Sequence, residues 1–161
     1  MLKNQITTKS AQETKAFAKK IVRELLALNK NRVICLYSNL GGGKTTFTQG
    51  LAEELGITEI VNSPTFLIMK KYRRRHSEMS PSSTNNKKYT LYHFDCYRIS
   101  DYQEILDLGW EEIISDENNI IVIEWPEKIK KILPEKRLDI KFEFIDENTR
   151  KIVMRNNNLT I

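Results

Sequence analysis

The sequence contains few cysteines, glycines and prolines and no long hydrophobic run. Its 161 residues include 2 cysteines, 6 glycines and 4 prolines. Two cysteines are too few for a fold that is stabilised by several disulfide bonds, so we expect Cys35 and Cys96 to be reduced and mostly buried. No apolar segment approaches the roughly 18 residues of a membrane span, and the first ten residues lack the apolar centre of a signal peptide. These absences predict a single cytoplasmic domain over residues 1–161, with no membrane partner.

The formal net charge of +5 is distributed unevenly along the chain. Seven basic residues and one acid lie between Lys70 and Lys88, so this segment carries more than the whole net charge. Its middle is polar and has almost nothing to bury, which predicts a flexible basic hairpin tip at about residues 73–88. Such a patch is typical either of nucleic-acid contact or of a solvated loop.

Hydrophobic periodicity predicts alternating strands and helices. Ser10 and Glu13 have the S-x-x-E form of a capping box, and the apolar spacing after them predicts a helix ending near Asn29. We expect buried strands at 33–37 and 119–123, a hairpin from 66–72 and 88–95, a helix at 103–114 broken at Gly109, a short helix at 126–133, and a closing hairpin from 138–145 and 151–155.

The segment from Leu40 to Thr46, with the sequence LGGGKTT, lies between a predicted buried strand and a predicted helix. Glycines let backbone N–H groups approach a phosphate chain, and the helix directs its free N–H groups and positive dipole end at it. We expect Lys44 to reach the β- and γ-phosphates and the Thr45 hydroxyl to bind Mg²⁺. The candidate nucleotide ligands here are Leu40, Gly41, Gly42, Gly43, Lys44, Thr45 and Thr46, with ATP and Mg²⁺ as cofactors. A plain Gly-rich turn is the alternative.

Ser38 departs from the phosphate-loop pattern G-x-x-x-x-G-K-[ST], which has glycine at this position. If the loop requires a positive φ there, serine costs about 1 kcal/mol more than glycine. The sequence therefore predicts weakened nucleotide affinity under that condition, with the identity of the site unchanged.

Two acids end predicted strands. In an open α/β sheet, ligands gather at the carboxyl ends of the strands, so Glu124 is expected near the phosphate loop, where it would bind Mg²⁺ directly or through water. Asp95 is expected to orient the attacking water or to join the outer shell of the metal. The structural alternatives are a surface carboxylate for Glu124 and an Asx turn or helix cap for Asp95.

Three further features have both a functional and a structural interpretation. His93 faces the same way as Asp95 by strand alternation, and a structural hydrogen bond is its favoured role. The segment Asn62–Thr65 places hydroxyls, including that of Thr65, where a nucleotide-sensing loop would lie, or it is a plain Ser-Pro turn. Trp125 would contact nucleotide or a partner, or it packs against the core.

Four motifs, in this order and spacing, resemble the TsaE family of small bacterial ATPases in tRNA threonylcarbamoyladenosine biosynthesis. They are Leu40–Phe47 (LGGGKTTF), Ser63–Thr65 (SPT), His93–Arg98 (HFDCYR) and Glu124–Pro126 (EWP). The resemblance covers nearly the whole chain. It implies a P-loop NTPase-like, three-layer α/β fold with a mixed, mainly parallel central sheet and antiparallel hairpins.

The resemblance also implies a reaction and partners. The family couples Mg²⁺-dependent ATP hydrolysis to the TsaB–TsaD heterodimer, which transfers a threonylcarbamoyl group to the adenosine beside the anticodon of tRNA. Contact with tRNA would be indirect, with the Lys70–Lys88 segment as an optional direct contact.

Matching motif by motif, the resemblance implies roles for individual residues. Lys44 and the loop amides would hold the phosphates, Thr45 and Glu124 the Mg²⁺, and Asp95 with Lys44 would be catalytic. Ser63–Thr65 would act as a switch-like segment, and residues 8–14 resemble the adenine-side region. Ser38-Asn39 stands where the family usually has Gly-Asp or Gly-Glu, so Asn39 lacks the charge of that acid.

Two other functions fit parts of the pattern. A small-metabolite P-loop kinase would share the phosphate loop, but it would need an arginine-bearing lid, and outside the basic segment the sequence has no arginine cluster. A nucleic-acid-binding module would use the Lys70–Lys88 patch.

Overall fold

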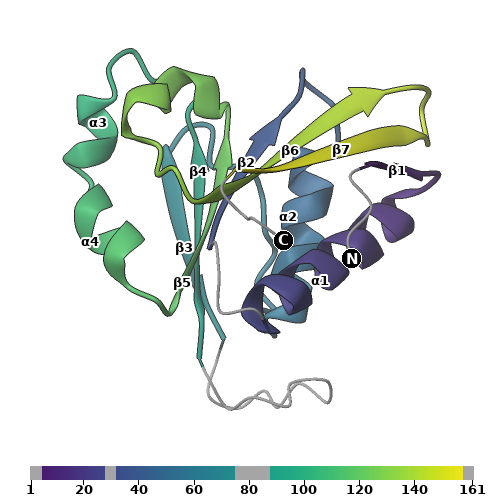
Figure 1. Ribbon diagram of the computed structural model, residues 1–161, viewed down its shortest axis with the longest axis horizontal. Coiled ribbons are helices and arrows are strands. Elements are labelled where there is room, and N and C mark those ends of the chain that lie inside the picture. The colour runs from purple at the N-terminus through teal and green to yellow at the C-terminus, as the bar shows by residue number, and fades with distance from the viewer. Residues whose placement is uncertain (1–4, 28–31, 75–87, 158–161) are drawn as a thin grey trace.

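The computed structural model describes residues 5–27, 32–74 and 88–157 (Figure 1). The predicted basic tip therefore lies mostly outside the described residues. In chain order the elements are β1 (Gln5–Thr8), α1 (Ala11–Ala27), β2 (Val33–Tyr37), α2 (Lys44–Glu54), β3 (Met69–Arg73), β4 (Thr90–Asp95), α3 (Gln103–Leu106), α4 (Trp110–Ser115), β5 (Asn119–Glu124), the 3₁₀ helix η1 (Pro126–Ile132), β6 (Arg137–Phe144) and β7 (Arg150–Asn157).

The strands form one mixed sheet of seven in the order β1-β7-β6-β2-β5-β4-β3. The four inner strands β6, β2, β5 and β4 are parallel to one another. Antiparallel pairs extend the sheet on both sides, through β7 and β1 at one end and β3 at the other. This arrangement confirms the mixed sheet with antiparallel hairpins, and it explains the unbroken apolar runs of β2 and β5, which are covered on both faces.

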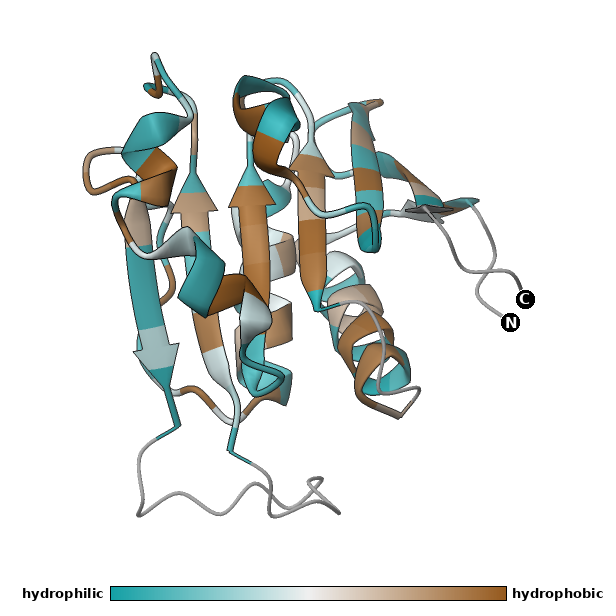
Figure 2. Ribbon diagram, turned by 60° about the vertical axis from the view of Figure 1, so that its left-hand side comes forward, coloured by the Kyte–Doolittle hydropathy of each residue, from teal (hydrophilic) through white to brown (hydrophobic). Residues whose placement is uncertain are grey.

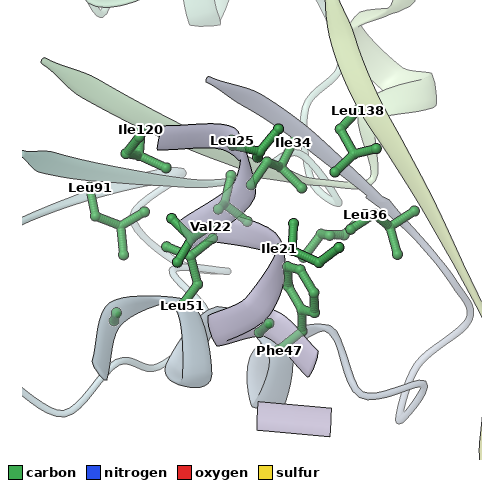
Figure 3. Packing of buried hydrophobic residues seen from close by; sticks show 14 of the residues in the cluster. Ile21, Val22, Leu25, Ile34, Leu36, Phe47, Leu51, Leu91, Ile120 and Leu138 are labelled. Atoms are coloured by element: carbon green, nitrogen blue, oxygen red, sulfur yellow. The ribbon is translucent and has the colours of Figure 1, made fainter. Parts of the chain in front are cut away.

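One face of the sheet is covered by α1 and α2. Buried side chains from both helices, among them Ile21 and Phe47, pack against Ile34, Leu91 and Ile120 of the sheet (Figure 3). The two helices approach closely at Gly50, where an added Cβ atom would lie 2.5 Å from the Cα atom of Lys15. The hydroxyl of Ser10 accepts a hydrogen bond from the Glu13 N–H, which confirms half of the predicted capping box, while the Glu13 carboxylate caps the Lys9 N–H.

The other face is covered by α3, α4 and η1, so that the sheet is the middle of three layers (Figure 1). Trp110 packs edge-on against Phe94 of β4, with ring centroids 5.5 Å apart. Gly109, at φ 84°, separates the two short helices, as the predicted break required. Both cysteines are free and buried, as expected. Burial raises the pKa of the Cys35 thiol, and it raises the pKa of Cys96 to about 12.

Strand β3 begins later than predicted and forms an edge of the sheet. The prediction of a strand from residue 66 is wrong for Phe66, Leu67 and Ile68, which form a turn in which the Leu67 N–H donates to the carbonyl of Pro64. Ile68 has a φ of 63°, which no strand accommodates. Phe66 and Leu67 are therefore exposed, although an apolar run normally signals burial. Figure 2 shows the edge strand as largely hydrophilic beside its apolar neighbours.

Candidate functional site

The loop between β2 and α2 is shaped by its glycines. Gly41 and Gly43 have φ values of 75° and 101°, in the left-handed region that side chains disfavour. An added Cβ atom at Gly42 would lie 2.0 Å from the Ser38 hydroxyl oxygen, so only glycine fits there. Helix α2 begins at Lys44, directly after Gly43, and its first N–H groups face the loop. The loop therefore has the glycine-dependent backbone that the sequence predicted, and the start of α2 follows it directly.

Ser38 does not cause the strain that the sequence suggested. Among the described residues that are not glycine, only Ile68 and Trp125 have a positive φ, so the predicted penalty at Ser38 is absent. The Ser38 hydroxyl instead accepts a hydrogen bond from the Lys44 ammonium group at 3.1 Å. Lys44 also donates to the carbonyl oxygens of Ser38 and Asn39, each at 3.2 Å. Serine at this position thus helps to hold the lysine.

Lys44 is nearly buried, with 6% of its surface exposed. Burial lowers the pKa of its ammonium group, and the nearby charges of Glu124 and Asp95 oppose this effect. The ammonium nitrogen lies 4.8 Å from the centre of the Trp125 ring, and the rings of Trp125 and Tyr97 are 5.1 Å apart. Trp125 therefore packs against the core, which confirms the structural interpretation, and it also lines the pocket.

The two predicted acids lie side by side at the carboxyl edge of the sheet. Asp95 and Glu124 are register partners on β4 and β5, and Glu124 is in turn level with Leu36 of β2. This arrangement confirms that Glu124 ends a strand parallel to the one that leads into the loop. Both acids are 3% exposed, so the alternative of a surface carboxylate at Glu124 is wrong.

Each acid is held by a different hydrogen-bond network. His93, which is fully buried, bonds through Nε2 to Oε1 of Glu124 at 2.9 Å, and this confirms its structural role. Asp95 Oδ2 accepts hydrogen bonds from the hydroxyls of Ser63 at 2.5 Å and Thr65 at 2.8 Å. Asp95 Oδ1 accepts from the Tyr97 N–H, which is the Asx turn considered as an alternative. The turn orients the carboxylate, so the structural and functional roles are compatible.

One pocket of about 360 Å³ contains the ten residues that were predicted to bind nucleotide or Mg²⁺ or to be catalytic, namely Leu40–Thr46, Thr65, Asp95 and Glu124. It is lined by Leu40, Gly41, Gly42, Gly43, Lys44, Thr45, Thr46, Ser63, Thr65, Asp95, Tyr97, Glu124, Trp125 and Arg150. Thr8 and Thr14, from the adenine-side resemblance, do not line it; their hydroxyls form a buried hydrogen bond of 2.8 Å with each other. The prediction missed Arg150. No local motif marks this arginine; it reaches this edge because β6, the strand before it, is parallel to β2.

The donor set fits a magnesium ion that arrives with a nucleotide. Within the described parts of the chain, no group of three or more His, Cys, Asp or Glu side chains could hold a metal ion alone. Magnesium typically keeps several waters and takes one or two protein oxygens together with substrate phosphates. The Thr45 hydroxyl and the Glu124 carboxylate, in the same pocket as the glycine cradle, are such a set.

The described residues include no helix that is long and apolar enough to span a membrane.

Comparisons with known proteins identify the family of this chain. The family model described as threonylcarbamoyl adenosine biosynthesis protein TsaE matches residues 8–152. The tRNA threonylcarbamoyladenosine biosynthesis protein TsaE of Bacillus subtilis (strain 168) is 39% identical over 145 residues, covering 90% of this chain and 80% of the relative. The protein of that name from Rickettsia bellii is 33% identical over 151 residues, covering 93% of each chain.

A solved structure shows the same fold. The crystal structure of Bacillus subtilis YdiB aligns with a TM-score of 0.68 and 32% sequence identity, covering 96% of this chain and 85% of that one. The family match spans the phosphate loop, both acids and the start of β7. By this match and the identity to its relatives, the chain belongs to the TsaE family of tRNA threonylcarbamoyladenosine biosynthesis proteins.

Proposed function

We propose that this protein is a Mg²⁺-dependent ATPase that acts with a TsaB–TsaD heterodimer in the threonylcarbamoyl modification of tRNA. The observation that carries the proposal is the single pocket that joins the glycine cradle, Lys44, Asp95 and Glu124. A phosphate loop alone would support nucleotide binding, whereas two buried acids beside it supply the groups that hydrolysis needs.

Each group of pocket residues would have a separate role in binding or hydrolysis. Amides of the loop and of the first turn of α2 would bind the phosphates, and Lys44 would exchange its carbonyl partners for phosphate oxygens. Thr45 and Glu124 would hold Mg²⁺, which neutralises charge on the phosphate oxygens. Asp95 would orient the attacking water, because its carboxylate is fixed by Ser63, Thr65 and the Tyr97 N–H.

The Asp95 network supports a switch-like role for Ser63–Thr65. Both hydroxyls donate to one carboxylate oxygen, so this segment is tied to the acid beside the nucleotide pocket. Movement of either hydroxyl towards a bound nucleotide or its metal would change the position of Asp95. We propose that this link makes the loop sensitive to the bound nucleotide.

Exposed apolar side chains near the pocket support a protein partner. Leu40 and Tyr97 line the pocket and are 77% and 44% exposed, and Phe66, one residue after Thr65, is 83% exposed. Exposed apolar groups gathered beside a functional site are typical of interaction surfaces. The partner pair would cover them, and tRNA would then be engaged through the pair. A direct contact through the Lys70–Lys88 segment remains a separate proposal.

The test is ATP turnover with and without the partner pair and tRNA, scored also for the modified nucleoside. We expect slow hydrolysis by the protein alone, an increase with the pair, and a loss of at least about 100-fold in Lys44→Ala. Lys128→Ala, which removes the same charge from the exposed surface of η1, is the matched control. Turnover that does not depend on the pair would contradict the proposed partner, and an active Lys44→Ala protein would contradict the proposed site.

A further inference from the structure

Arg150 is the one residue of the pocket that neither the motifs nor the proposed reaction explain. It is the first residue of β7, directly after the turn that follows β6. The chain separates it from the phosphate loop by more than a hundred residues, yet its Nη2 atom donates to the carbonyl oxygen of Gly41 at 3.3 Å. Its Cγ atom is the nearest atom to the Cβ position of Gly43, at 3.8 Å. Arg150 therefore lies against Gly41 and Gly43, the two glycines of this loop that have a positive φ.

The guanidinium group of Arg150 is held by neutral groups. Its Nη1 atom donates to carbonyl oxygens of the β6–β7 turn, including that of Thr149 at 2.9 Å. Its carbon centre lies 4.7 Å from the middle of the Phe144 ring. Its Nε atom is buried and has no hydrogen-bond partner. A buried donor on a charged group is costly when unpaired, so this N–H indicates an acceptor that the chain itself does not provide.

The sheet order defines which part of a nucleotide this donor can reach. Strand β2, which leads into the phosphate loop, has β5 and β4 with the two acids on one side, and β6 and β7 with Arg150 on the other. Glu124 and Thr45, the proposed Mg²⁺ ligands, would bind the terminal phosphates. Arg150 approaches the loop from the opposite side, so it would meet the part of the phosphate chain that is remote from the metal.

We infer that Arg150 is a nucleotide-binding residue whose side chain turns from the carbonyl oxygens that hold it and donates, through Nε and an Nη atom, to the phosphate chain on the side away from the metal. Guanidinium groups bind phosphate in this bidentate way. The charges of the pocket agree: its lining contains two acids, Asp95 and Glu124, and Arg150 joins Lys44 as the second cation that offsets them. This inference rests on the proposed nucleotide-binding function and adds a residue to it.

The test measures affinity and turnover separately in Arg150→Gln. We expect the Kd values of MgADP and of a non-hydrolysable MgATP analogue to rise together, by about 10- to 100-fold, since a hydrogen bond to a charged group is lost. The kcat at saturating ATP should change by less than about threefold, because a contact away from the metal contributes to binding rather than to the chemical step. Arg150→Lys keeps the charge and loses Nε, so its Kd values should lie between those of the wild type and those of Arg150→Gln.

Arg155→Gln is the matched control, because it removes the same charge from an exposed position on the same strand. Its Kd values should equal those of the wild type. If the wild type binds nucleotide and Arg150→Gln binds it equally well, the inference about Arg150 is wrong but the proposed function is not affected. A fall in kcat at unchanged affinity would also overturn it, since Arg150 would then act on the chemical step. Failure of the wild type to bind either nucleotide would overturn the proposed function and the inference together.

Discussion

The two sides of the phosphate loop are built in different ways. On the side of β5 and β4, His93, Asp95 and Glu124 are at most 3% exposed and are fixed by hydrogen bonds between side chains. On the side of β6 and β7, Arg150 is half-buried and held mainly by backbone carbonyls of a turn, beside Phe144, which is 61% exposed. The acidic side is thus part of the core, whereas the basic side is part of the surface.

This difference separates the two tasks that the proposed function assigns to the pocket. Groups that position a metal or a water must keep their geometry, and buried polar side chains that are bonded to one another are costly to rearrange. A group that only binds an anion can exchange neutral carbonyls for phosphate oxygens, and a half-buried side chain next to a turn moves at less cost than a buried one. The following changes test whether the two sides are as different as their contacts indicate.

Glu124→Gln should have the largest effect. The amide keeps the size of the side chain and can still bond to His93, but it loses the negative charge that would bind Mg²⁺. We expect ATP turnover at saturating Mg²⁺ to fall by at least about 100-fold, with ADP binding in the absence of Mg²⁺ little changed. Steady-state hydrolysis and calorimetry measure the two quantities.

Glu127→Gln is the control for this change, because Glu127 is exposed on η1, lies three residues further along and does not line the pocket. Its turnover should stay within about twofold of the wild type. Full activity in Glu124→Gln would show that the acidic side does not perform the chemistry. The proposed difference in task between the acidic and basic sides would then be wrong.

His93→Leu should have the next largest effect, and its main readout is stability. Leucine leaves a buried oxygen of the Glu124 carboxylate without its donor, so the free energy of unfolding should fall by about 2 kcal/mol. Arg150→Gln, on the other side of the loop, should cost less than about 1 kcal/mol. Chemical denaturation measures both. Equal losses would mean that the two sides are equally rigid.

Ser38→Gly should have the smallest effect. Ser38 lies at the end of the central strand, between the two sides, and its φ is not positive. Glycine would remove one of three acceptors of Lys44 and keep both carbonyls. We expect the Kd of MgADP to change by less than about threefold. A change of tenfold or more would make the Ser38 hydroxyl a determinant of affinity. The loop itself, and not only its two sides, would then control nucleotide binding.

Much of the site could be predicted because its residues follow local rules. The glycines precede a helix, Glu124 ends an apolar strand and Asp95 ends an alternating one, so their meeting point follows from parallel strands that share an edge. The hydrogen bonds of Ser63 and Thr65 to Asp95 could not be predicted. They join segments that are 30 and 32 residues apart, and no periodicity records which side chains meet.

The errors also have physical causes. Phe66 and Leu67 have the composition of a strand, but the turn after Pro64 and the left-handed Ile68 leave them exposed, so tertiary context overrides the pattern. The concern about Ser38 assumed a backbone conformation that the loop places at Gly41 and Gly43 instead. Arg150 was missed because it belongs to no local motif, and only the strand order brings it to the loop.

The edge position of β3 gives part of the basic segment a further meaning. In the sheet that the described residues form, β3 is the last strand, and it carries Lys70, Lys71 and Arg73. An open strand edge is a template on which a second molecule can add its own strand, and charge along the edge discourages this. These cations would repel the same edge of another copy. The composition that suggests a nucleic-acid binder therefore also disfavours pairing between the β3 edges of two copies.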